Sequence, residues 1–110
     1  MHHINPDMKR CIDDCLRCYQ TCLSTAMGHC LVIGGAHTEQ KHFTLIMACV
    51  EICRTAAHFM LLSSAHHRHV CSECAEICDQ CAVDCERLGD MQECVDACRR
   101  CAESCRQMAA

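Results

Sequence analysis

Cysteines recur along this chain at alternating spacings of four and three residues. The first block holds Cys11, Cys15, Cys18 and Cys22, a middle block holds Cys71, Cys74, Cys78, Cys81 and Cys85, and a last block holds Cys94, Cys98, Cys101 and Cys105. Because an α-helix turns once in 3.6 residues, side chains at this spacing share one helix face. The pattern predicts amphipathic helices in which thiols occupy the stripe that leucine or isoleucine normally fills in a bundle core.

Turn residues predict where these helices begin and end. Asn5 before Pro6 suits the cap and first turn of a helix, which we expect to continue until Gly34-Gly35 ends it. Asp90 and Glu93 have the spacing of a capping box at the start of the last helix. The four predicted helices run from Pro6 to Ile33, from about Thr38 to Leu62, from about His66 to Leu88, and from Asp90 to about Met108.

The connections between these helices are short, and the sequence has no alternating strand pattern. Short connections favour antiparallel neighbours, so we expect an all-α, up-down-up-down four-helix bundle with a Cys-lined core. With 110 residues the chain is long enough for one core, and we predict a single domain over residues 1–110.

Composition narrows the class of protein and its compartment. Sixteen cysteines are far more than average, which is typical of a disulfide scaffold, a metal site or a redox centre. The first residues contain no apolar stretch of signal-peptide length, so we expect a cytoplasmic protein with reduced thiols. A net charge of −4 with one Tyr and no Trp argues against a nucleic-acid partner. The sequence has no unbroken apolar run of about 18 residues, so we expect no membrane span.

A core packed mainly with cysteine would leave voids, and voids in a protein core are destabilising. Something is therefore expected to fill the space between the helices. Disulfides within one helix fit poorly, because Cβ atoms at i and i+4 are about 5–6 Å apart and a disulfide needs roughly 3.5–4.5 Å. The same separation suits two thiolates on either side of one soft metal ion.

Charge balance favours a monovalent ion over zinc. A divalent ion with four thiolates leaves two negative charges in a dry interior, whereas about one monovalent ion per thiolate leaves the interior nearly neutral. Soft thiolate ligands and a monovalent ion select Cu(I), so we predict multiple Cu(I) ions per chain. The second helix contributes only Cys49 and Cys53 to its stripe, and Cys30 lies just off the stripe near the end of the first helix. The predicted ligands are Cys11, Cys15, Cys18, Cys22, Cys30, Cys49, Cys53, Cys71, Cys74, Cys78, Cys81, Cys85, Cys94, Cys98, Cys101 and Cys105, with His29 and His42.

The chain also resembles a known family. Its CxxxC pairs, the run Asp14-Cys15-Leu16-Arg17 and the stretches Cys71–Cys78 and Cys101–Cys105 resemble the four-helix-bundle copper storage proteins, over nearly the whole length. With no signal peptide evident, the resemblance is to the cytosolic branch. It implies many Cu(I) ions inside each bundle and a homotetramer.

Histidines and methionines are expected to mark the two ends of the bundle. His29, Cys30 and His42 fall near one end, where we predict an entrance for copper. Met60 and Met108 fall at the far end, where we expect packing rather than metal binding. His66, His67 and His69 are expected to be solvated there, His58 to point away from the cysteines, and His2, His3 and His37 to lie on flexible segments.

The second helix carries apolar residues on the side away from Cys49. Phe43, Met47, Val50 and Leu61 recur there at helical spacing. A helix that is apolar all round needs a second surface to bury against, and a closed homo-oligomer is the ordinary solution. We therefore predict a subunit interface on this face.

The predicted function is copper storage or sequestration without catalysis, because no nucleophile with a base and an orienting acid can be identified. Two alternatives stay open. One is a zinc or iron-sulfur binding protein. The other is a thiol redox protein that uses CxxC pairs such as Cys15/Cys18 and Cys98/Cys101, although redox CxxC motifs normally sit at an exposed helix start.

Overall fold

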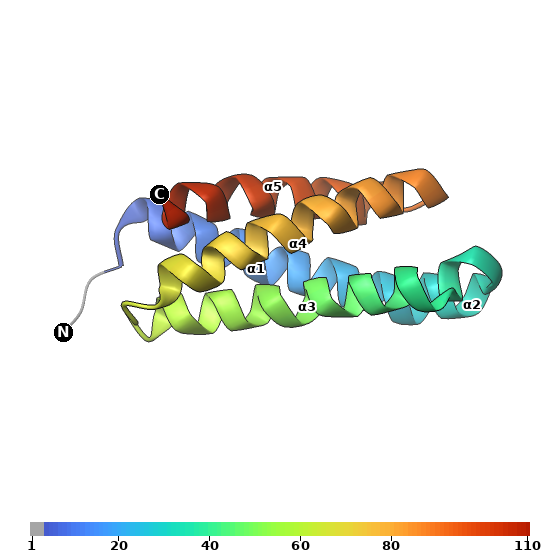
Figure 1. Ribbon diagram of the computed structural model, residues 1–110, viewed down its shortest axis with the longest axis horizontal. Coiled ribbons are helices and arrows are strands. Elements are labelled where there is room, and N and C mark those ends of the chain that lie inside the picture. Colours follow the sequence, from blue (N-terminus) through green and yellow to red (C-terminus); the bar gives the residue numbers. More distant parts are fainter. Residues whose placement is uncertain (1–3) are drawn as a thin grey trace.

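Four long antiparallel helices form an elongated bundle with extents of 48 × 21 × 20 Å (Figure 1). The computed structural model describes residues 4–110, and within that range it contains helices and turns but no strand. In chain order α1 packs against α3, α3 against α4, α4 against α5, and α5 back against α1. The all-α, up-down-up-down prediction is confirmed. The helices are α1 Pro6–Thr25, α2 Leu31–Ile33, α3 Gln40–Leu61, α4 His67–Leu88 and α5 Gln92–Ala109.

The first helical segment begins and ends where the sequence predicts. The side chain of Asn5 accepts a hydrogen bond of 2.8 Å from the Met8 amide, and Pro6 occupies the first turn. The chain stays helical to Ile33 and stops at Gly34, whose φ of 72° suits a residue without a Cβ. One feature was not predicted: a π-helical turn over Ala26–Cys30 separates α1 from α2.

The predicted capping box at the start of α5 is wrong. Asp90 adopts a left-handed conformation with φ of 59°, and the cap position belongs to Met91, whose side chain is only 4% exposed. A side-chain cap contributes about 1 kcal/mol, whereas burying a methionine side chain contributes about 1.5–3 kcal/mol. The stronger hydrophobic term therefore decides how the chain enters α5.

The core of the bundle is made of sulfur, as predicted. Every cysteine is buried to 1% exposure or less; fifteen lie on the inward sides of α1, α3, α4 and α5, and Cys30 lies in the π turn. The larger fully buried side chains are few, and Ile46, Met60 and His42 are the largest of them. The helices themselves are held by local signals and apolar packing, while their shared interior is chemically a set of thiols.

The outward side of α3 differs in part from the prediction. Leu61 is exposed and Phe43 and Met47 are half-buried, but Val50 is buried within the chain. The expectation that Val50 lies on a free outer face is wrong, because α1 and α4 flank α3 on both sides and cover a wider arc of it than the cysteine stripe alone. Other apolar side chains are exposed elsewhere, chiefly Leu31, Val32 and Ile33 in α2 and Val83 on α4.

One described helix, α3, is long and apolar enough to cross a membrane by length and composition alone. This is weak evidence, because the core helix of a bundle passes the same test. Here α3 packs between α1 and α4 with Cys49 and Cys53 fully buried. Its packing is that of a core helix.

Candidate metal centre

The helix stripes bring the cysteines of all four long helices together along the bundle axis. Contacts between Sγ atoms range from 3.0 Å, for Cys22 and Cys94, to 4.0 Å, for Cys101 and Cys105. These contacts connect the cysteines into one network, with Cys30 and Cys71 outside it among the described residues. A disulfide has an S–S distance of about 2.0 Å, and all sixteen thiols are free.

The network is built from pairs that bridge two helices. Within pairs the Sγ atoms lie 3.5 Å apart for Cys53 and Cys78, and 3.9 Å apart for Cys18 and Cys49. We call each such pair a rung. Along the axis the rungs are Cys15/Cys105, Cys74/Cys101, Cys53/Cys78, Cys18/Cys49, Cys22/Cys98 and Cys81/Cys94.

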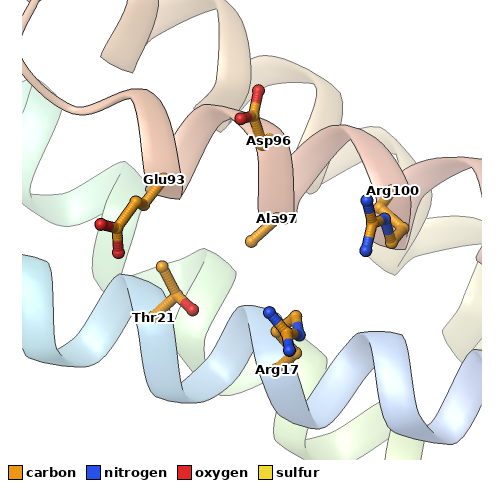
Figure 2. Close-up of a pocket in the computed structure, with 6 residues that line it drawn as sticks. All are labelled: Arg17, Thr21, Glu93, Asp96, Ala97 and Arg100. Carbon is orange, nitrogen blue, oxygen red and sulfur yellow. The ribbon is translucent and has the colours of Figure 1, made fainter.

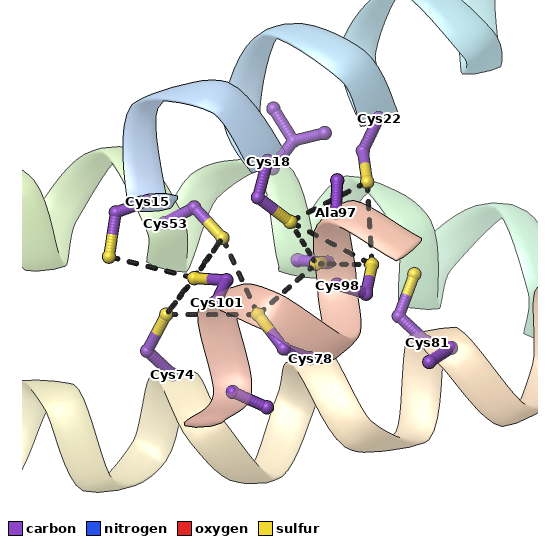
Figure 3. Close-up of a cluster of buried hydrophobic side chains, with 14 of the residues drawn as sticks. Cys15, Cys18, Cys22, Cys53, Cys74, Cys78, Cys81, Ala97, Cys98 and Cys101 are labelled. Carbon is purple, nitrogen blue, oxygen red and sulfur yellow. Dashed lines mark hydrogen bonds between the residues drawn. The ribbon is translucent and has the colours of Figure 1, made fainter. Parts of the chain in front are cut away.

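Successive rungs combine into groups of four sulfurs whose Sγ atoms all lie within 4.8 Å of one another. Neighbouring groups share a rung, and Figure 3 shows how sulfurs from different helices converge between the ribbons. The spacing within single helices predicted two thiolates on either side of one ion, whereas these groups of four combine sulfurs from different helices. The i,i+4 contacts exist, as at Cys74 and Cys78 with 3.8 Å, but antiparallel packing sets each pair against cysteines of the neighbouring helices.

Hydrogen bonds distribute the protons of this network unevenly. Hydrogen bonding to Cys22 lowers the pKa of Cys94 to about 6. Hydrogen bonds with Cys101 lower the pKa of Cys74 and raise that of Cys53. Burial adds an upward contribution to each, because a dry interior disfavours the thiolate. Metal ions bind thiolates, so a metal that enters the network must displace protons.

Cys30 and His42 contact each other beyond one end of the network. In a regular α-helix Cys30 would lie beside the stripe, as the sequence indicated. The π turn adds one residue to a helical turn and so rotates the following residues back by about 100°, which brings Cys30 into the core with 0% exposure. Its Sγ atom lies 3.6 Å from Nε2 of His42. Burial raises the pKa of the Cys30 thiol.

Asp84 fixes the orientation of the His42 ring. Oδ2 of Asp84 accepts a hydrogen bond of 2.6 Å from Nδ1 of His42, and Arg87 donates to the other carboxylate oxygen at 2.8 Å. Although partial burial raises it, the hydrogen bonds from Arg87 and His42 bring the pKa of Asp84 below its ordinary value. With the proton on Nδ1, Nε2 keeps its lone pair on the side of Cys30. This carboxylate–histidine arrangement is common behind metal-ligating histidines.

The sequence did not identify Asp84, which has the ordinary signature of a charged residue on a helix. It also misjudged His37, which was expected on a flexible segment. His37 lies in the 3₁₀ turn Gly35–Thr38, half-buried, with its ring centroid 5.2 Å from that of His29 and 6.3 Å from that of His42. The paired glycines before it were the available signal, since they allow a tight reversal.

The residues at the opposite end lie as predicted except His67, whose Nδ1 lies 2.8 Å from the carbonyl oxygen of Ser64. His66 and His69 are exposed, His67 is half-buried, and His58 faces outward. Met60 is fully buried and Met108 half-buried. His2 and His3 lie outside the described residues.

A groove of about 280 Å³ on the outer surface lies between α1 and α5 and has no thiol in its lining (Figure 2). Arg17 and Thr21 of α1 line one side of it, and Glu93, Asp96, Ala97 and Arg100 of α5 line the other, so the lining carries charges of both signs. The groove is a solvated seam between two helices and is separate from the sulfur network.

Comparisons with known proteins agree with this geometry. The family model described as copper storage protein matches residues 4–110. A crystal structure of a protein from Nitrosospira multiformis shares 54% identity over 94% of both chains, with a TM-score of 0.92. The Cu(I)-bound copper storage protein BsCsp3 shares 32% identity over 94% of this chain and 99% of its own, with a TM-score of 0.87. The apo form of copper storage protein 3 from Bacillus subtilis shares 33% identity over 93% and 98%, with a TM-score of 0.77. No curated protein sequence matches the chain.

Proposed function

Since the chain belongs to the copper storage protein family, we propose that it stores multiple Cu(I) ions in the sulfur network of its bundle. The observation that carries this is the sharing of rungs between neighbouring four-sulfur groups. Among the described residues, every cysteine sulfur except those of Cys30 and Cys71 belongs to one continuous array, so thiolates can bridge metal ions along the axis. An array of this kind suits many soft, monovalent ions.

Charge balance supports Cu(I) as the cargo. The network is buried, and sixteen thiolates without counter-ions would be strongly destabilising in a dry core. A number of Cu(I) ions approaching the number of thiolates neutralises the interior. We propose all sixteen cysteines as ligands, with His42 beside Cys30 at the end of the array and His29 as a nitrogen ligand outside that end.

Zinc is the second candidate, because four converging sulfurs at these distances also fit a tetrahedral site. Shared rungs argue against it. Two adjacent zinc ions would compete for the same two cysteines, and separate sites with four thiolates each would leave two negative charges per ion.

The end with Cys30 and His42 is the proposed entrance for copper. There the contact with Asp84 orients the His42 ring, so that Nε2 directs its lone pair toward Cys30. A cavity of about 380 Å³ beside His29 leads from the surface to Cys94. A neutral imidazole can pass a cation on to thiolates without holding it as tightly as they do.

Storage involves no chemical conversion, and we propose that the protein has no catalytic activity. We further propose a cytoplasmic location, which suits sixteen free thiols and a cargo that must stay reduced. The exposed apolar residues Leu31, Val32 and Ile33 of α2 and Val83 of α4 support a homo-oligomer, for which we propose a tetramer.

Anaerobic titration of the reduced, metal-free protein with Cu(I) and, in parallel, with Zn(II) tests the proposal. Copper uptake should continue toward one ion per thiolate in competition with a Cu(I) chelator. Zinc should stop at no more than about four ions, the number that sixteen cysteines in groups of four allow. If copper uptake also stopped at about four ions per chain, storage in an array of shared sulfurs would be contradicted.

A further inference from the structure

Two imidazole rings at the entrance end of the bundle have buried nitrogen atoms that nothing in the residue range 4–110 engages. They are Nε2 of His29 and Nε2 of His37. Buried polar atoms are almost always hydrogen-bonded, so each exception needs an explanation. Two such atoms on neighbouring rings call for one explanation that serves both.

Local backbone structure places these two rings together. His29 lies in the π turn, which rotates it off the cysteine stripe when it brings Cys30 onto that stripe. His37 lies in the 3₁₀ turn that follows Gly34 and Gly35, whose φ angles of 72° and 57° reverse the chain. The amide of His37 bonds to the Gly34 carbonyl at 3.1 Å and holds the turn closed. The rings meet edge to face at a centroid distance of 5.2 Å and an interplanar angle of 83°.

His42 is not part of this pair. Its Nδ1 is bonded to Asp84 and its Nε2 faces Cys30, so both of its nitrogens belong to the end of the sulfur network. His29 and His37 are therefore a separate pair of rings, and the unpartnered nitrogens of this pair lie outside the sulfur network.

The surroundings of His29 favour a cation. His29 lines the cavity of about 380 Å³ at the turn between α4 and α5, together with Asp90, Glu93 and Cys94. The two carboxylates make the cavity attractive to a positive ion. Cys94 lies 3.0 Å from Cys22, so the same cavity ends at the first sulfurs of the network.

We propose that His29 and His37 form a two-imidazole site that binds one Cu(I) ion outside the sulfur network, next to its entrance. This inference rests on the proposed storage function and adds a site of different ligand chemistry. Imidazole nitrogen is a good ligand for copper, and two neutral rings can hold Cu(I) in low coordination. Because thiolates hold Cu(I) more tightly, the site retains an ion only after the network is filled.

Nitrogen NMR of the histidine side chains tests the site directly. Reduced protein is loaded with Cu(I) until the thiolate–copper absorption in the ultraviolet stops rising, and one further equivalent is added. The Nε2 resonances of both His29 and His37 should then shift. In His37→Ala the affinity for this last ion should fall by at least about tenfold and the His29 shift should disappear. In His29→Ala the His37 shift should disappear.

His69→Ala is the matched control, because His69 is an exposed histidine at the opposite end of the bundle, and it should keep both shifts. If neither ring or only one ring shifts in the wild-type protein, the two-imidazole site is refuted. The thiolate–copper absorption separates this outcome from failure of the storage proposal. If that absorption never develops, the storage function fails, whereas normal absorption without the ring shifts refutes only the histidine site.

Discussion

Replacing single cysteines should show whether each thiolate holds its own share of copper. Cys18 is a stringent position, because it belongs to two four-sulfur groups and lies 3.7 Å from Cys98 and 3.9 Å from Cys49. Cys30 is the comparison, since it lies outside the sulfur contacts among the described residues and faces only the imidazole of His42, at 3.6 Å. Both thiols are fully buried, so Cys18→Ser and Cys30→Ser make the same chemical change in different surroundings.

The expected size of the effect follows from electrostatics. A ligating sulfur lies about 2.3 Å from its metal ion, so at an effective dielectric constant of 20 its charge contributes more than about 4 kcal/mol, which corresponds to at least about a thousandfold in affinity. Cys18→Ser should therefore remove about one ion from the tightly bound fraction and leave the rest of the array in place. Cys30→Ser should remove about one ion from the most weakly bound fraction.

Competition with Cu(I) chelators of graded affinity, followed by metal counting, measures the two fractions separately. Circular dichroism of each metal-free variant checks that the bundle is still folded. Loss of four or more ions from Cys18→Ser would indicate discrete cooperative clusters. No loss at all would mean that Cys18 is not a ligand. Either result would contradict the expectation that each thiolate is neutralised by about one Cu(I) ion of its own.

Two further predictions concern the protein without metal and its far end. The reduced, metal-free chain should already be mostly helical, because the Asn5 cap, the glycine turns and the apolar packing need no ion, and a random-coil far-UV spectrum that becomes helical only with copper would contradict this. Met60 should act by packing. Met60→Ala should destabilise the bundle by about 2–5 kcal/mol and Met60→Leu by less than about 1.5 kcal/mol in urea unfolding, and neither should change the number of copper ions bound; a lost ion in Met60→Leu would identify Met60 as a ligand.

Local features of the chain were enough to predict most of the fold. Helix periodicity placed the cysteine blocks on buried faces, and Asn5, Pro6, Gly34 and Gly89 marked helix boundaries within a few residues of those observed. These signals act between residues at most four positions apart, so they can be read along a single chain. The same periodicity placed His42 and Met60 correctly on the inward side of α3.

Tertiary structure decided which sulfurs meet. Cys53 pairs with Cys78 and Cys22 with Cys98 because the turns set the axial register of antiparallel helices, and no spacing within one helix encodes that register. The π turn that moves Cys30 into the core and the burial of Met91 in place of an Asp90 cap likewise depend on contacts with other helices. The cysteine stripes follow from the local sequence, because a helix repeats every 3.6 residues. The sulfur array follows from the tertiary structure, because it exists only where the stripes of four helices come into contact at one register.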